Sequence, residues 1–171
     1  MAQTTIKTDS AAIQQYHGML KSAEGQDALH EGNVRRAFET LLRETAKAKN
    51  WELVTEESIR REGANTIRYD GTLRDANRLP HGWWEAKDTK DDLDTEIRKK
   101  REKNYRFDNI IFEDTQTGVL FQDGLEVVRR DLSKAEQVAD LLSRFYSHEI
   151  EPFTKFNQAV AYFQGEIPHI A

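Results

Sequence analysis

One short stretch decides how the rest of the chain can be organised: Gly82-Trp83-Trp84-Glu85-Ala86-Lys87-Asp88. In a β-strand, alternate side chains point to the same face of the sheet. Glu85 and Lys87 would then project together, on the same side as Trp83. Trp84 and Ala86 would face the opposite way. The stretch therefore predicts a carboxylate and an ammonium group side by side at the end of an apolar strand.

Composition limits the class of protein. The chain has 171 residues, of which 37% are hydrophobic and 32% charged, which is enough for one compact domain with well-solvated helices. No apolar run approaches the roughly 20 residues of a membrane-spanning helix, and Met1–Ser10 lacks the apolar segment of a signal peptide. The chain has no cysteine, which excludes disulfides and thiolate metal sites. These features predict a cytoplasmic protein.

The charge pattern argues mildly against strong DNA binding by this domain alone. The net charge is −5, whereas independent DNA-binding domains are usually basic. Positive charge is instead concentrated in one run, whose members are Arg98, Lys99, Lys100, Arg101, Lys103 and Arg106. A solvated helix face is the commoner meaning of such a run, and a surface that contacts phosphates is the alternative.

Hydrophobic periodicity predicts an α/β fold with a central mixed β-sheet. Short links between the early strands imply antiparallel neighbours. Asp70-Gly71 and Asp123-Gly124 are dipeptides favoured in tight hairpin turns, and Ser133-Lys134-Ala135-Glu136 has the pattern of a helix capping box. The expected elements are helices over 11–24 and 33–49, strands over 51–60, 64–69, 72–75 and 82–87, a helix over 91–103, a strand over 109–113, a hairpin over 118–130, and helices that begin near Ser133 and at Pro152. The middle of this order is α-β-β-β-α-β.

The residue types on the opening strand suit metal-dependent hydrolysis of a phosphodiester. Mg²⁺ needs hard oxygen ligands, and the reaction needs an activated water and charge stabilisation at the phosphate. Two carboxylates on neighbouring strands would hold the cation, and Lys87 would orient or deprotonate the water or neutralise the transition state. Asp75, separated from Glu85 by nine residues, is the preferred partner acid. Asp70 is the second candidate, because a hairpin turn would already explain it.

The strings Asp70-Gly71-Thr72-Leu73-Arg74-Asp75 and Gly82–Asp88, in this order of elements, resemble the PD-(D/E)xK nuclease superfamily. More narrowly they resemble the Mrr-like N-terminal nuclease domain of Type ISP enzymes, which are single-chain, Type I-like restriction-modification enzymes. The resemblance covers residues 33–112 and extends to the whole chain. It implies a restriction-endonuclease-like core and Mg²⁺-dependent cleavage of double-stranded DNA, with Mn²⁺ able to substitute.

The resemblance also implies roles for individual residues. Asp75, Glu85 and Lys87 would form the catalytic set, with Asp70 in reserve, and Glu44 on the preceding helix would complete the metal shell. Many relatives carry a Gln-x-x-x-Tyr pair on the helix after the motif, and Arg101 and Tyr105 have this spacing with arginine in place of glutamine. The residues expected to contact DNA are Arg98, Lys99, Arg101 and Tyr105.

The resemblance further implies a single nuclease domain over residues 1–171 that belongs to a longer chain. Its parts would be an N-terminal helical segment (1–32), a catalytic core (33–113), and a hairpin with C-terminal helices (114–171). Helicase or translocase, methyltransferase and target-recognition domains would lie further along the polypeptide. Because one such site cuts one strand, a double-strand break would need either a second nuclease copy or repeated nicking.

Two other functions are compatible with the sequence. In the first, the domain is an inactivated nuclease fold that docks DNA or another domain, and Glu85 and Lys87 are an exposed strand pair. In the second, it is a stand-alone repair nuclease. The histidines have no metal-ligand spacing, and His81 is notable only because it lies beside the motif strand.

Overall fold

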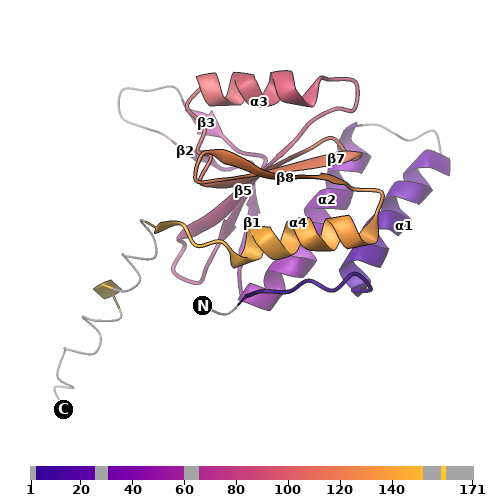
Figure 1. Ribbon diagram of the computed structural model, residues 1–171, viewed down its shortest axis with the longest axis horizontal. Helices are drawn as coiled ribbons and strands as arrows, with labels where there is room; N and C mark the ends of the chain where they lie inside the picture. Colours follow the sequence, from indigo (N-terminus) through magenta and orange to yellow (C-terminus); the bar gives the residue numbers. More distant parts are fainter. Residues whose placement is uncertain (1–2, 26–30, 60–65, 152–158, 161–171) are drawn as a thin grey trace, which may run out of the picture.

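A mixed six-stranded β-sheet forms the centre of the computed structural model, which describes residues 3–25, 31–59, 66–151 and 159–160 (Figure 1). The strand order is β1-β4-β5-β6-β7-β8, and every neighbouring pair is antiparallel except the parallel pair β5 and β6. The strands are β1 (Glu52–Thr55), β4 (Gly71–Arg74), β5 (Pro80–Ala86), β6 (Asn109–Glu113), β7 (Thr117–Gln122) and β8 (Leu125–Asp131). The expected mixed sheet is confirmed.

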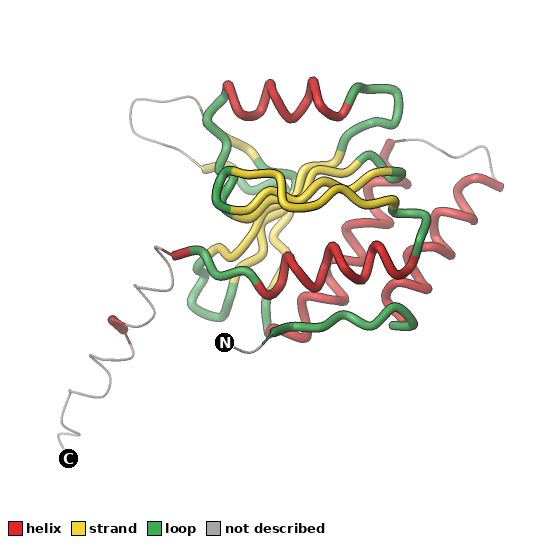
Figure 2. Tube along the Cα trace, in the orientation of Figure 1, coloured by secondary structure: helices red, strands yellow, loops and turns green. Residues whose placement is uncertain are grey.

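Helices cover both faces of the sheet (Figure 2). The helix α3 (Leu93–Glu102) lies on one face, and α1 (Ala11–Gly25), α2 (Glu31–Ala46) and α4 (Ala135–Ser147) lie on the other. A short 3₁₀ helix over Lys47–Lys49 leads from α2 into β1. Parallel strands need a crossover connection, and α3 supplies it between β5 and β6. The order α2-β1-β4-β5-α3-β6 is the predicted α-β-β-β-α-β core.

The two tryptophans of β5 anchor the strand in two separate cores. Trp83 packs on the α3 face with Leu93 and Ile97. Trp84 packs on the opposite face, where its ring stacks on Phe38 of α2 with centroids 5.9 Å apart. The predicted alternation along β5 is therefore confirmed, and it directs Glu85 toward the α3 side of the sheet.

The predicted hairpin at Asp70-Gly71 is wrong. The strand before it, β3 (Ile67–Arg68), pairs with β2 (Ser58–Ile59) in a separate two-stranded sheet, and Gly71 is the first residue of β4. A Cβ atom on Gly71 would lie 2.7 Å from Leu53 Cδ1 and 2.9 Å from Trp84 Cε3. The glycine is therefore needed for close packing, and Asp70 has no turn role that would explain it.

The second predicted hairpin, at Asp123-Gly124, is confirmed. It joins the antiparallel strands β7 and β8, and both residues have positive φ, 51° and 84°. The expected capping box before α4 is wrong, because Ser133 Oγ donates to Asp131 and the N-cap residue Lys134 makes no side-chain capping bond. Of the strand predicted over 64–69, residues 64–65 lie outside the described residues, and within the described part Ile67–Arg68 form β3. The helix predicted from Pro152 falls mostly outside the described residues.

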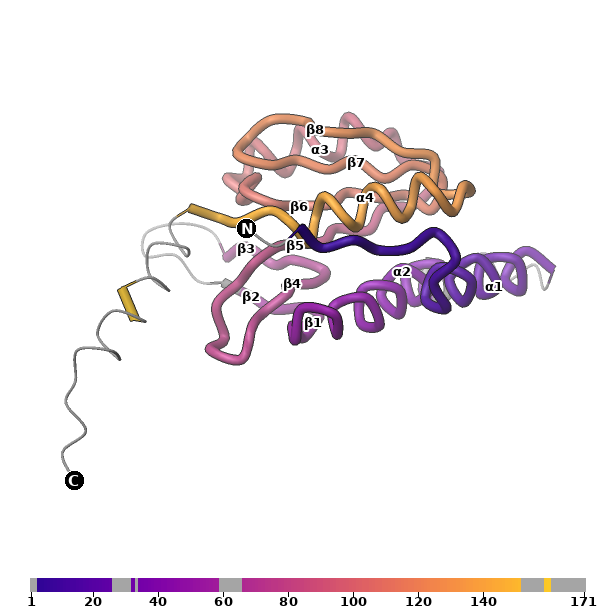
Figure 3. Tube along the Cα trace, turned by 60° about the horizontal axis from the view of Figure 1, so that its bottom comes forward, coloured from indigo at the N-terminus to yellow at the C-terminus, as the bar shows by residue number. Residues whose placement is uncertain are grey.

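The chain before α1 runs beside α4 (Figure 3). The backbone amides of Thr4 and Ile6 donate to Ser147 Oγ and Ser143 Oγ. Two segments more than 130 residues apart in sequence are thereby tied together. None of the helices in the described ranges is long and apolar enough to cross a membrane.

Candidate active site

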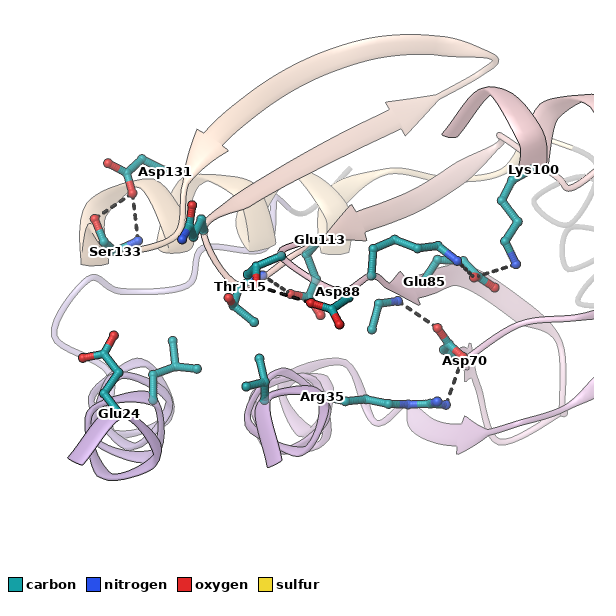
Figure 4. Close-up of a pocket in the computed structure, with 16 residues that line it drawn as sticks. Glu24, Arg35, Asp70, Glu85, Asp88, Lys100, Glu113, Thr115, Asp131 and Ser133 are labelled. Carbon is teal, nitrogen blue, oxygen red and sulfur yellow. Dashed lines mark hydrogen bonds and ion pairs between the residues drawn. The ribbon is translucent and has the colours of Figure 1, made fainter. Parts of the chain in front are cut away.

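A cavity of about 630 Å³ opens at the end of β5, between α2 on one side and α3 on the other (Figure 4). Its lining comes from segments that are far apart in sequence, because the sheet brings the ends of β5 and β6 together beneath the helices. The charged residues that line it are Glu24, Arg35, Asp70, Glu85, Lys87, Asp88, Lys100, Glu113 and Asp131. Three of the predicted site residues, Asp70, Glu85 and Lys87, therefore share one cavity.

The carboxylate of Asp70 is fixed against the motif strand. Gly71 lies opposite Trp84 in the β4–β5 register, so Asp70 lies beside Glu85. Its Oδ2 accepts a hydrogen bond from the Ala86 amide at 2.8 Å, and its Oδ1 lies 3.0 Å from an Arg35 guanidinium nitrogen. The β4–β5 register and the ion pair with Arg35 of α2 together hold Asp70 at the cavity.

Glu85 is a buried carboxylate with one oxygen paired and one oxygen without a partner. Its Oε2 lies 2.9 Å from Lys100 Nζ and 3.6 Å from Lys87 Nζ. Its Oε1 is buried and makes no hydrogen bond within the described part of the protein. Burial, and then the charge of Asp70, raise the pKa of Glu85, while the two lysines act in the opposite direction.

The acid pair has the chemistry of a partial Mg²⁺ site. Mg²⁺ is commonly bound through one or two carboxylates, with water and substrate phosphates as the remaining ligands. A cation between Asp70 and Glu85 would relieve their repulsion and give the buried Glu85 Oε1 a partner. No group of three or more His, Cys, Asp or Glu side chains suited to a metal was found among the described residues. The two acids would therefore need water or phosphate oxygens to complete the ligand set.

The structure does not bring Asp75, the preferred partner acid, next to Glu85. Asp75 follows β4 at its far end, five residues beyond the position opposite Glu85, which is roughly 16 Å along a strand. It does not line the cavity. Its Oδ2 lies 2.8 Å from His81 Nε2, and its Oδ1 accepts from the Asn77 and Leu79 amides. Asp75 thus shapes the loop between β4 and β5.

Glu44 also lies away from the cavity. Its carboxylate is exposed on α2 and pairs with Lys47 at 2.8 Å. The geometry gives it no contact with Asp70 or Glu85 through which it could complete a metal shell.

The residues expected to contact DNA divide into two groups. Arg98 and Lys99 are exposed on α3, and Lys99 pairs with Glu96 at 2.7 Å. Arg101 turns toward the β7–β8 hairpin, where its guanidinium lies 4.2 Å from the Phe107 ring centroid and donates to the Gly124 carbonyl. Tyr105 donates to the Arg68 carbonyl and accepts from Lys100. Arg98 and Lys99 thus lie on the exposed side of α3, whereas Arg101 and Tyr105 make contacts within the protein.

Among the cavity residues that were not predicted as site residues are Arg35, Lys100 and Glu113. Lys100 lies one turn after Ile97 and Arg35 three residues before Phe38, so helical periodicity alone could have placed both on inner faces. Glu113 ends the apolar strand β6, and no sequence pattern indicates that its side chain lines the cavity. It is buried, accepts from Trp84 Nε1 at 3.2 Å and the Thr115 amide at 2.8 Å, and burial raises its pKa to about 8.

A solved structure shares this fold. The chain is similar to a chain of the DrdV–DNA complex determined by cryo-EM, with a TM-score of 0.80 and 38% sequence identity over 92% of this chain. The match spans 16% of the length of that chain. No protein-family model and no curated protein matches. The likeness and the element order confirm the expected restriction-endonuclease-like core.

Proposed function

We propose that this chain is an Mg²⁺-dependent DNA endonuclease domain that acts in DNA restriction. The observation that carries the proposal is the convergence of Asp70, Glu85 and Lys87 at the end of β5, with Glu85 Oε1 buried and without a hydrogen-bond partner in the described structure. Two acids and a lysine on adjacent strands are the set that metal-assisted phosphodiester hydrolysis needs.

Each residue has a distinct task in this proposal. Asp70 and Glu85 would hold the cation, which would supply Lewis-acid activation of the phosphate and of a water. Lys87 Nζ lies 3.6 Å from Glu85 Oε2 and its side chain is 15% exposed, so it can reach a ligand in the cavity. There it orients the attacking water or neutralises charge that develops on the phosphate. The Arg35 guanidinium, 3.0 Å from Asp70 Oδ1, holds the Asp70 carboxylate in place.

DNA as the substrate is supported by the likeness to a protein solved in complex with DNA. The exposed cations Arg98 and Lys99 on α3 would contact phosphates beside the cavity. The net charge of −5 suits a domain that cuts DNA held by other parts of the protein. The match covers 16% of the chain in the DrdV–DNA complex, so most of that chain lies outside the matched region. We assign the other parts of the protein to translocase, methyltransferase and target-recognition domains of a Type ISP-like enzyme, with a second nuclease copy for double-strand breaks.

The test uses the full-length protein and its Glu85→Gln variant, which keeps the shape of the side chain and removes its charge. Wild-type protein should cut double-stranded DNA with Mg²⁺ or Mn²⁺ and stop when EDTA is added. Glu85→Gln should bind the same DNA and leave it intact. Cleavage by Glu85→Gln at the wild-type rate would exclude this site. A wild-type protein that binds DNA, binds no metal and cuts nothing would indicate an inactivated docking module instead.

A further inference from the structure

Lys100 enters the cavity from α3, opposite Arg35 (Figure 4). Its Nζ lies 2.9 Å from Glu85 Oε2 and donates to Tyr105 Oη at 3.1 Å. Tyr105 Oη donates in turn to the Arg68 carbonyl at 2.9 Å. A continuous series of contacts thus connects the carboxylate on β5 to α3 and to the backbone of β3.

Lys100 makes the direct contact with Glu85. At 2.9 Å its Nζ is within hydrogen-bond range of Oε2, whereas Nζ of the motif lysine Lys87 is 3.6 Å from the same atom. The side chain of Lys100 is 16% exposed, and its ammonium lies 4.3 Å from the centroid of the Tyr105 ring. A partly buried, charge-assisted hydrogen bond restricts a carboxylate more than an exposed ion pair does. Of the two lysines, Lys100 therefore makes the closer contact with Glu85.

The orientation matters because the two oxygens of Glu85 have different surroundings. Oε2 is occupied by the lysines, and Oε1 is buried with no partner among the described residues. A carboxylate with one oxygen anchored presents the other in a fixed direction, as outer partners do for metal ligands in general. The anchor also means that Lys87 is not required to hold Glu85.

We propose that Lys100, supported by Tyr105, is a positioning residue that fixes Glu85 for divalent-cation binding and leaves Lys87 available for the phosphate or the water. The inference rests on the proposed nuclease function and extends it to a residue outside the Asp…Glu-x-Lys motif. In this proposal the residue of α3 that acts with Tyr105 is Lys100. Arg101 has the expected spacing from Tyr105 but contacts the Gly124 carbonyl and the Phe107 ring.

A competing role for Lys100 predicts the opposite result. Arg35, Lys87 and Lys100 surround the two carboxylates, so Lys100 could act only as a cation that occupies the place of the metal. Removal of such a competitor would tighten metal binding. Removal of a positioning residue would weaken it. The sign of the change in metal affinity therefore separates the two roles.

The experiment is a calorimetric titration of the full-length protein with Mn²⁺, beside a measurement of DNA cleavage against Mn²⁺ concentration. Lys100→Met should bind Mn²⁺ about tenfold more weakly and need a correspondingly higher concentration for cleavage. Lys100→Arg, which keeps the positive charge, should recover part of the affinity, and Tyr105→Phe should show a smaller loss. The control is Lys7→Met, which removes the same charge from an exposed residue before α1.

The outcomes distinguish the inference from the function on which it rests. If the wild type binds Mn²⁺ and cuts DNA while Lys100→Met binds Mn²⁺ as tightly or more tightly, the positioning role is refuted and the nuclease function stands. If the wild type neither binds Mn²⁺ nor cuts DNA, both are refuted. Thermal unfolding reports whether Lys100→Met folds. If Lys100→Met does not fold, the Mn²⁺ affinity of Tyr105→Phe tests the inference instead. An unchanged affinity in Tyr105→Phe would then refute the positioning role of Lys100.

Discussion

The Oδ2 oxygen of Asp70 accepts a hydrogen bond from the backbone amide of Ala86 at 2.8 Å, at the residue between Glu85 and Lys87. This contact aligns the acid that precedes β4 with the two motif side chains on β5. Antiparallel register decides which acid meets Glu85, since Gly71 pairs with Trp84 and Arg74 pairs with Pro80. The strand neighbour of the motif is therefore Asp70, and Asp75 lies at the other end of β4.

The two aspartates should respond differently to loss of charge. Asp70→Asn should lower the cleavage rate at least about a hundredfold, because it removes one of the two carboxylates proposed to hold the cation. Asp75→Asn should cut near the wild-type rate and lose about 1 kcal/mol of stability, because it weakens the contact with His81. Initial cleavage rates and urea unfolding of both variants check this. Loss of cleavage in Asp75→Asn alone would restore Asp75 as the ligand.

Lys87→Met should separate catalysis from DNA binding. The methionine keeps most of the side-chain volume and removes the ammonium group, so the fold and the DNA contacts of α3 should persist. The cleavage rate should fall about 10²- to 10⁴-fold, the range for loss of a group that assists proton transfer. Single-turnover cleavage and fluorescence anisotropy measure the two properties. The matched control is Lys90→Met, an exposed lysine three residues later.

Glu113 should make stability depend on pH. Burial raises its pKa to about 8 from an ordinary value of 4.5, so the folded protein holds a proton that the unfolded chain releases. Its contribution is favourable below pH 4.5 and is lost progressively as the pH rises toward 8. Glu113→Gln should remove this dependence, with a relative gain on the order of a few kcal/mol near pH 8. Urea unfolding of both proteins across this range is the measurement. Parallel pH profiles would contradict the assignment.

Gly71→Ala should destabilise the fold. The new methyl group would meet Leu53 Cδ1 at 2.7 Å and Trp84 Cε3 at 2.9 Å, both within the core under α2. Overpacking of this kind costs about 1–3 kcal/mol. Gly18→Ala is the control, because a Cβ there meets no atom within 4 Å. Thermal unfolding of the two variants should show a lower midpoint for Gly71→Ala alone.

The sequence predicted much of the fold because its signals are local. Alternation in β5 assigned Trp83 and Trp84 to opposite cores, and positive-φ residues at Asp123-Gly124 defined a true hairpin. The same reasoning failed at Asp70-Gly71, where the dipeptide suited a turn but the glycine serves packing against Trp84. Both a tight turn and close packing favour glycine, so the sequence alone does not distinguish them. At Gly71 the contacts with Leu53 and Trp84 show that packing is the reason.

The sequence by itself determined that an acid and a lysine project together from one strand, because a two-residue spacing in a strand has one geometric meaning. It could not determine which other groups meet them. That Asp70 rather than Asp75 lies beside Glu85, and that Lys100 and Arg35 contact the two carboxylates, follows from strand register and from the approach of two helices on opposite faces. These are contacts between residues 15 to 35 positions apart, and only the tertiary structure decides them, because no local periodicity encodes where separate elements meet.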